Sequence, residues 1–327
     1  MERRVSMADV AAVAGVSGQT VSRVVNGSPR VDPDTRRRVE RAMAELDYRP
    51  HRAARALRTG RTDTIGLVVS TLATVGNSRM LQAIAAAAAG RGFALTVVTA
   101  SGRDAVAQGF TRLHEQGVDG AIVLNEATAL ARAVEVPRSL ALVVVDSPPD
   151  DRYVVVQTDH AAGARAATAH LLALGHRVVH HLAGPAESYA AAERERGWRD
   201  ALTAAGAPTP EPLRGDWSSA SGHAAVAGLP SEATALFAAN DQMALGALRA
   251  LADAGRVVPA AVSVVGFDDV ADAAQYRPPL TTVRQDFDAL GAAAVEALVA
   301  AIGGGRSAAT VLTPTLVGRV STAVPPA

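Results

Sequence analysis

The chain of 327 residues lacks both cysteine and lysine, and all 32 of its strongly basic residues are arginines. These two absences exclude several classes of site. Without lysine there is no P-loop for phosphates and no Schiff-base chemistry. Without cysteine there is no thiol nucleophile, disulfide or thiolate metal site. The missing cysteine says nothing about the cellular compartment, because it removes the disulfide evidence in both directions.

Aromatic residues are scarce, at 3%, whereas 49% of the residues are hydrophobic and 20% are charged. This composition is typical of a globular protein, and the length allows two or three structural units. The longest largely apolar run, residues 80–89, is far shorter than the about 20 residues that span a bilayer. Residues 1–6 are not followed by the apolar segment that a secretory signal needs. We therefore expect a protein of the cytoplasm.

The net charge of zero conceals an uneven distribution. Residues 1–60 contain 12 arginines and 7 acidic residues, a net charge of +5, and the rest of the chain carries −5. A small basic segment attached to a larger acidic region indicates that residues 1–60 bind a polyanion. A solvated basic surface is the alternative, and charge alone does not separate the two.

The start of the chain has the pattern of a helix-turn-helix. Ser6 opens a first short helix with a capping box, and Gly15 is placed to end it. Ser17 caps a second helix over residues 18–25, and two short helices joined around a glycine form this motif. A third helix is expected over residues 34–46.

The second helix presents polar side chains outward, among them Gln19 and Arg23. In the major groove of DNA, glutamine pairs with adenine and arginine with guanine. The pattern therefore favours a helix that reads DNA, and the alternative is an ordinary three-helix cap.

Beyond Thr64, short valine-rich runs alternate with alanine-rich stretches of helical length. The runs predict strands at residues 65–69, 94–99, 120–124, 140–145, 154–156, 178–182, 235–238 and 262–266. Runs that are apolar on both sides indicate parallel strands with crossover helices, and these are too many for one comfortable sheet. We expect two doubly wound α/β lobes, whose ligands lie beyond the carboxyl ends of the strands.

Polar side chains stand at or after several of these strand ends. They are Asp146, Arg194, Trp217, Asn240 and Asp268. Carboxylate, amide and guanidinium groups bind paired sugar hydroxyls, and a tryptophan face packs against the C–H surface of a pyranose. The alternative is that strand-end side chains cap the following helices. For Asp241 and Asp269, both ligand binding and helix capping are possible interpretations.

Residues 7–26 closely resemble the start of the lactose-repressor (LacI/GalR) family of bacterial transcription regulators, and residues 48–50 and 53–57 resemble its hinge segment. The resemblance implies an all-α headpiece with a hinge helix, followed by two lobes of periplasmic-binding-protein type. It implies a headpiece and hinge at residues 1–60 and an effector-binding and dimerisation core at residues 61–327. The N-lobe is expected at about 62–158 and 288–317, and the C-lobe at about 159–287 and 318–324.

The resemblance also implies which residues contact DNA. They are Ser6, Ser17, Gly18, Gln19, Thr20, Ser22, Arg23 and Asn26 in the headpiece, and Ala54 and Leu57 in the hinge. Leu57 would wedge into the minor groove at the centre of the site, where an apolar wedge unstacks a base step and bends the duplex. A core position in a linker helix is its alternative. Gly18 replaces an aromatic base-reading residue of the member that gives the family its name, so we expect a different operator base there.

Residues 215–218, 239–247, 262–269 and 278–287 extend the similarity nearly residue for residue. They imply an effector site lined by Thr74, Met80, Asp146, Arg194, Trp217, Asn240, Asp268 and Gln285, with Gly76 and Asn77 beside them. Ala190 replaces a small polar contact residue, which removes one hydrogen bond to a sugar. A galactoside is the effector that the resemblance implies. No metal or cofactor is expected.

The expected function is repression of a sugar-utilisation operon by a homodimer that binds double-stranded operator DNA and leaves it on binding sugar. We expect a dimer because the chain ends at Ala327 without a leucine-heptad tetramerisation tail, and because two helix-turn-helix units read two half-sites. Such a protein acts at the nucleoid. The alternatives are a family member with its sugar as co-repressor, and a periplasmic-type sugar-binding protein without a role on DNA. No enzyme is expected, because the Gly-x-Ser-x-Gly and His-Glu-x-x-His motifs are absent.

Overall fold

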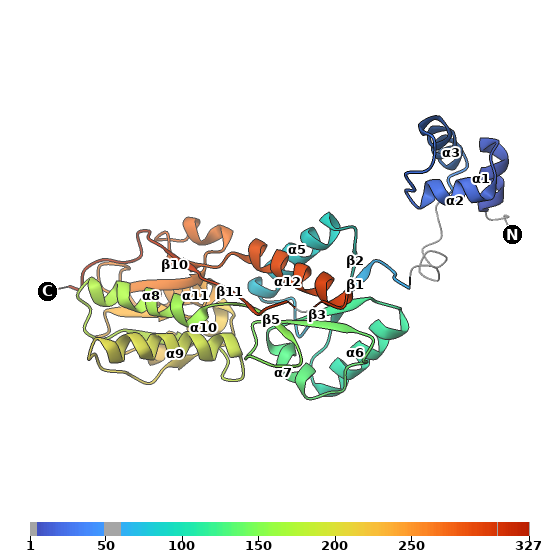
Figure 1. Cartoon of the computed structure of the whole chain (residues 1–327). Coiled ribbons are helices and arrows are strands. Elements are labelled where there is room, and N and C mark those ends of the chain that lie inside the picture. Colours follow the sequence, from blue (N-terminus) through green and yellow to red (C-terminus); the bar gives the residue numbers. More distant parts are fainter. Residues whose placement is uncertain (1–4, 49–59, 306, 327) are drawn as a thin grey trace. The chain divides into compact units, whose positions relative to one another are not determined.

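The computed structural model describes residues 5–48, 60–305 and 307–326. The chain divides into two units, Met1–Thr62 and Asp63–Ala327, each of which is described by itself (Figure 1). The expected hinge helix, with Ala54 and Leu57, lies outside the described residues.

Three helices lie in the described residues of the first unit, and the sequence supplies a side-chain cap for each of them. The helices are α1 (Met7–Ala14), α2 (Gly18–Val25) and α3 (Pro33–Glu45). Ser6 and Ser17 accept hydrogen bonds from the first turns of α1 and α2, and Gly15 ends α1 with a φ of 62°. The helices meet at the buried side chains of Val10, Val21 and Val39. The predicted helix-turn-helix is confirmed.

The second unit contains two six-stranded sheets, each covered by helices on both faces. The first sheet has the strand order β11-β5-β4-β3-β1-β2, and its strands are all parallel. They are β1 (Thr64–Val69), β2 (Ala94–Thr99), β3 (Gly120–Leu124), β4 (Ala141–Val145), β5 (Val154–Thr158) and β11 (Thr310–Leu312). The helices are α5 (Val75–Gly90), α6 (Arg103–Glu115), α7 (Glu126–Arg132) and α12 (Phe287–Ile302). Alternate residues face opposite sides: Leu67 packs with α5 and α12, and Val68 packs with α6 and α7.

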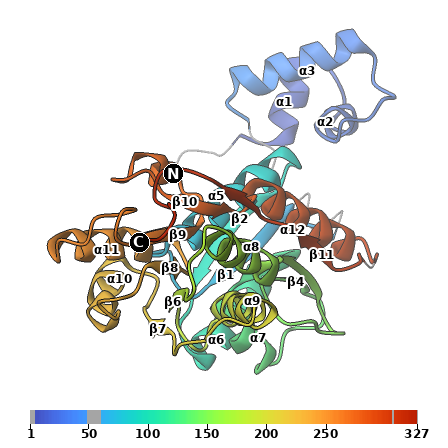
Figure 2. The ribbon, with the colours of Figure 1, turned by 90° about the vertical axis from the view of Figure 1, so that its left-hand side faces the viewer.

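The second sheet has the strand order β12-β10-β9-β8-β6-β7, in which β12 is antiparallel to β10. Its strands are β6 (His180–Ala183), β7 (Leu213–Arg214), β8 (Ala235–Ala238), β9 (Ser263–Asp268), β10 (Thr281–Arg284) and β12 (Thr315–Val317). Its helices are α8 (His160–Ala173), α9 (Tyr189–Ala204), α10 (Ser219–Ala225) and α11 (Asp241–Asp253), with short 3-10 turns at Val226–Gly228 and Ala271–Gln275. Phe237 packs with α8 and α9, which lie side by side in Figure 2, and Leu236 packs with α11.

The chain passes between the two lobes after β5, after β10 and after β11. The α/β fold with two doubly wound lobes is confirmed. The lobe boundary near residue 317 needs correction, because β12 (Thr315–Val317) pairs with β10 in the second sheet and the last crossing therefore follows Leu312. In the described part of the chain, no helix is both long and apolar enough to cross a membrane.

Candidate functional site

A cavity lies at the carboxyl ends of strands from both lobes. The structure brings together in its wall all eight residues expected there: Thr74, Met80, Asp146, Arg194, Trp217, Asn240, Asp268 and Gln285. Gly76, Asn77 and Ala190 also line it. The position agrees with the rule that ligands of parallel sheets lie beyond the strand ends.

The cavity wall contains strained backbone. Of the seven non-glycine residues with positive φ in the described chain, four line the cavity: Asn125 (47°), Asp146 (52°), Trp217 (75°) and Asp268 (117°). Each such conformation costs on the order of 1–3 kcal/mol and is held only where the surrounding structure imposes it. The fold therefore fixes the directions in which these four side chains point.

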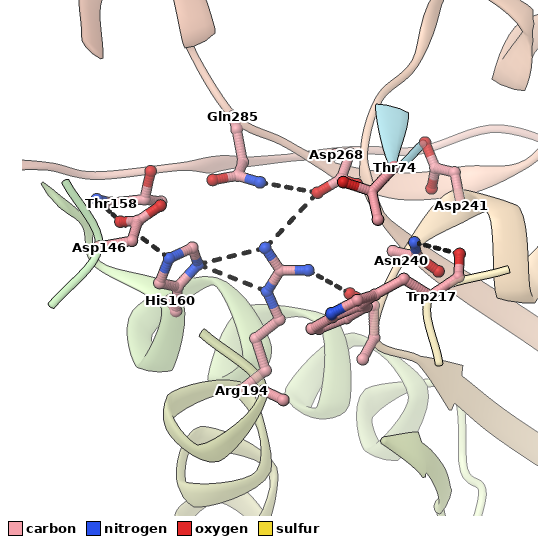
Figure 3. Close-up of polar contacts among 12 residues, drawn as sticks. Thr74, Asp146, Thr158, His160, Arg194, Trp217, Asn240, Asp241, Asp268 and Gln285 are labelled. Carbon is pink, nitrogen blue, oxygen red and sulfur yellow. Dashed lines mark hydrogen bonds and ion pairs between the residues drawn. The ribbon is translucent and has the colours of Figure 1, made fainter. Parts of the chain in front are cut away.

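Arg194 lies at the centre of the polar groups (Figure 3). It projects from α9 and is 4% exposed. Its Nη1 donates to the carbonyl oxygen of Ala239, its Nη2 lies 3.5 Å from Oδ1 of Asp268, and its Cζ stands 3.9 Å from the centroid of the Phe267 ring. Burial lowers the pKa of the Arg194 guanidinium, and nearby carboxylates oppose this shift. Burial likewise raises the pKa of Asp268, and Arg194 opposes that shift.

A buried histidine joins Arg194 to the other lobe. His160, the first residue of α8, has its Nε2 3.0 Å from Oδ1 of Asp146, and its Nδ1 accepts from Nε of Arg194 at 3.4 Å. The backbone N–H of Thr158 also donates to Asp146, at 3.0 Å. A row of polar groups, each within 3.5 Å of the next, therefore runs from Asp146, after β4 in the N-lobe, to Asp268 in the C-lobe.

Two amide side chains, those of Gln285 and Asn240, also line the cavity. Gln285 donates from Nε2 to Oδ1 of Asp268 at 2.7 Å, and its buried Oε1 has no hydrogen-bond partner among the described residues. An unmet buried acceptor costs about 1–3 kcal/mol, so this oxygen is suited to accept a ligand hydroxyl. Asn240 caps α11 through its Oδ1 and donates from Nδ2 to the carbonyl oxygen of Trp217 at 3.0 Å. Asn240 therefore both caps a helix and lines the cavity.

Similar proteins were found over nearly the whole chain. Residues 6–51 match the family model of bacterial regulatory proteins of the lacI family, and residues 168–322 match that of a periplasmic binding protein-like domain. The lactose operon repressor of Escherichia coli K12 is 40% identical over 306 residues, which cover 90% of this chain and 84% of that protein. The transcriptional regulator CelR of Thermobifida fusca is 40% identical over 324 residues, covering 92% and 93%. This chain belongs to the LacI family.

Solved structures of family members have the same architecture. The lac repressor dimer bound to operator and the anti-inducer ONPF has a TM-score of 0.87 at 37% identity, with 98% of this chain and 100% of that chain covered. A complex of CelR with cellobiose has a TM-score of 0.74 at 36% identity, covering 97% and 100%. These relatives are regulators of transcription rather than enzymes.

In this LacI-family chain, the expected DNA-contacting residues of the headpiece lie on α2, at its C-cap and at the N-caps of α1 and α2. Gly18, Gln19 and Arg23 are exposed on α2, Asn26 is exposed at its C-cap, and a Cβ at Gly18 would meet open space. Thr20 and Ser22 are half-buried. Ser6 and Ser17 are exposed but use their hydroxyls to cap helices.

Four side chains at the cavity were not predicted from the sequence. Glu126, Ser188 and Phe287 line the cavity, and His160 stands behind Arg194. Asn125 lines the cavity as well. Glu126 and His160 each begin a helix two residues after a strand ends, so their positions resemble that of Asp146, the first residue after β4.

The other two strand-end acids do not cap helices. Asp241 is fully buried and accepts from Oγ1 of Thr282 at 2.6 Å and from the backbone N–H of Val270 at 2.9 Å. Asp269 pairs with Arg284 and Arg319. Both acids support the loops behind the cavity, and neither lines it.

Proposed function

We propose that this protein is a homodimeric repressor that binds a specific operator and leaves it when a sugar enters the cavity. Residues 1–60 form the DNA-binding headpiece and hinge, and residues 61–327 form the effector-binding and dimerisation core. One observation carries the proposal: a helix-turn-helix unit shares a chain with a cavity whose buried polar groups come from two lobes. Such a regulator acts in the cytoplasm, on chromosomal DNA.

Sugar binding is proposed to act on the orientation of the two lobes. The row of polar groups from Asp146 to Asp268 crosses between the lobes, so a sugar that engages both ends favours one lobe arrangement over another. The resulting loss of operator affinity can be no larger than the ratio of the sugar's affinities for the two arrangements. The hinge residues Ala54 and Leu57 would transmit the change to the headpiece.

The effector is proposed to be a saccharide, with no preference for a galactoside. The lactose operon repressor and CelR are both 40% identical to this chain, and the structure of CelR was solved as a complex with cellobiose. Ala190 in the cavity wall also lacks the side-chain hydroxyl or amide that would contact a sugar. The comparisons therefore do not favour the galactoside implied by the resemblance.

On DNA, Gln19 and Arg23 are proposed to read bases, and Ser6, Ser17, Gly18, Thr20, Ser22 and Asn26 to lie against the backbone or the groove floor. Phosphate contacts make the affinity fall as salt rises. Selection of bound fragments from a random DNA pool, with the full chain, should yield a pseudo-palindromic site. At least one saccharide from a panel that includes lactose, cellobiose and ribose should release it by tenfold or more. A pool without enrichment would contradict the DNA-binding role, and an operator that no saccharide releases or tightens would contradict the effector.

A further inference from the structure

Glu126 brings a negative charge into the cavity without a neighbouring positive charge to balance it. It is the first residue of α7, directly after the strained Asn125, and it is half-buried in the cavity wall. Its one hydrogen bond in the described chain is a long one, from Oγ of Ser70 to Oε2 at 3.4 Å. No ion pair found among the described residues includes it, so its carboxylate keeps most of its capacity to accept hydrogen bonds.

The cavity as a whole has an excess of negative charge. Its wall contains three carboxylates, those of Glu126, Asp146 and Asp268, but a single guanidinium, that of Arg194. Arg194 is already paired with Asp268 and bonded to a backbone carbonyl, so it has little attraction left for an anionic ligand. Burial lowers the pKa of Arg194, and Glu126 opposes this shift less than Asp268, Asp146 and Asp241 do, so the Arg194 charge compensates Glu126 least of these four acids.

Glu126 differs from the other two carboxylates in the groups that it contacts and in the structural element that carries it. Asp146 faces His160, and Asp268 faces Arg194 and Gln285. Glu126 alone among them lies on a helix of the N-lobe, α7, and it lines the cavity without an ion pair among the described residues. A ligand that fills the cavity therefore meets Arg194 and Asp268 of the C-lobe and Glu126 of the N-lobe.

We propose that Glu126 is a specificity-determining residue, which accepts a hydrogen bond from a hydroxyl or amino group of the effector and excludes sugars that carry a negative charge there. Excluded ligands include uronates and sugar phosphates, because a second negative charge beside an unpaired carboxylate is repelled in a poorly solvated site. Neutral sugars are accepted, and a protonated amino sugar gains a charge-assisted hydrogen bond. This inference rests on the proposed sugar-binding function.

The test compares sugars that differ in charge but share a ring. The full chain is titrated with glucose, glucosamine and glucuronate, and with galactose, galactosamine and galacturonate, while the fluorescence of Trp217 is followed. The same six titrations are made with Glu126→Gln, which keeps the side-chain shape but removes the charge. Glu135→Gln, an exposed change of equal charge in the same lobe and outside the cavity, is the matched control.

Ratios of affinities decide the outcome, because any effect of a variant on folding or lobe orientation cancels within one variant. In Glu126→Gln the preference for the amino over the neutral sugar should fall about tenfold, and the discrimination against the uronate should weaken by a similar factor. Glu135→Gln should keep the ratios of the natural chain. Unchanged ratios in Glu126→Gln, with the neutral sugar still bound, would overturn the role of Glu126 alone. A natural chain that binds none of the six sugars, nor a disaccharide of either series, would overturn the proposed effector and this inference with it.

Discussion

Nη2 of Arg194 lies 3.5 Å from Oδ1 of Asp268, and each side chain is only 5% exposed. Taking two charges out of water costs several kcal/mol each, and only good geometry and further hydrogen bonds offset that cost. Here the offset comes from the Ala239 carbonyl, the ring of Phe267 and the amide of Gln285. The ion pair is therefore best understood as a preorganised part of the ligand site rather than as a source of stability.

Replacing Arg194 should abolish the sugar response and leave operator binding intact. Arg194→Ala leaves the buried Asp268 without its partner, so the free energy of unfolding should also fall by about 3–5 kcal/mol. The double change of Arg194→Met with Asp268→Asn leaves no unpaired charge, and should regain much of the stability without regaining the sugar response. Urea unfolding and sugar titration measure the two effects.

Arg196→Ala is the control for this prediction, since Arg196 stands on the same helix with a side chain that is 53% exposed. Its stability should change by less than about 0.5 kcal/mol, and its sugar response should stay normal. A normal sugar response in Arg194→Ala would refute the assignment of the cavity.

Gly184→Ala should damage the cavity from outside its polar network. A Cβ at Gly184 would lie 2.4 Å from Cη2 of Trp217, so the indole ring must move. Sugar affinity should fall by tenfold or more, and the fluorescence of the free protein should change because Trp217 is displaced. Gly318→Ala, where an added Cβ meets open space, should change neither. Equal sugar affinities of the two variants would show that the position of Trp217 does not matter for binding.

Gln19→Ala should reduce operator specificity without weakening binding to random DNA. Loss of a bidentate base contact costs about 1–3 kcal/mol, and only for the operator that carries the matching base. Gel-shift titrations against the selected operator and against a scrambled duplex separate these effects. Gln116→Ala, an exposed change outside the headpiece, serves as control. An equal loss of affinity for both duplexes would place Gln19 against the phosphate backbone instead.

Asp241 should give the folded protein a pH dependence that an isosteric variant lacks. Burial, with the nearby Asp268 charge next, raises the pKa of Asp241 from 3.8 to about 8. The folded state therefore holds a proton that the unfolded chain releases, and the stability contributed by this proton is full below pH 3.8 and is lost as pH rises towards 8. Asp241→Asn mimics the protonated acid, because its amide can donate to Oγ1 of Thr282 while its oxygen accepts from the N–H of Val270.

Urea unfolding of both proteins between pH 5 and pH 8 tests this prediction. Relative to the natural chain, Asp241→Asn should become more stable as pH rises. Stability profiles that stay parallel across this range would show that Asp241 is ionised in the folded protein at neutral pH.

The sequence predicted the parts of the fold that have a strong local pattern. All eight predicted strands are present, since runs such as residues 120–124 are apolar on both faces. The strands β7, β11 and β12 were not predicted, because they are two or three residues long and only partly buried. The strand β10 is buried, but its residues Thr281–Arg284 include a single apolar side chain, so it lacks the apolar run that marks the other strands. The pairing of β11 and β12 also depends on chain crossings between the lobes that no local pattern encodes.

The site was predicted where a polar side chain follows an apolar run that the sequence marks as a strand, as Asp146, Asn240 and Asp268 do. His160 and Glu126 also follow strands, but only the assembled sheets show that these two helix starts lie at the cavity. The capping readings of Asp241 and Asp269 failed for a similar reason, because their partners lie at least 15 residues away along the chain.

The most direct test of the account is the sugar affinity of the full chain measured with and without its operator. If sugar and operator favour different arrangements of one molecule, saturating operator must lower the sugar affinity by the same factor by which saturating sugar lowers the operator affinity. Titrations followed by Trp217 fluorescence and by gel shift give the two factors independently. We predict equal factors of at least tenfold. A sugar affinity that operator leaves unchanged would contradict the account.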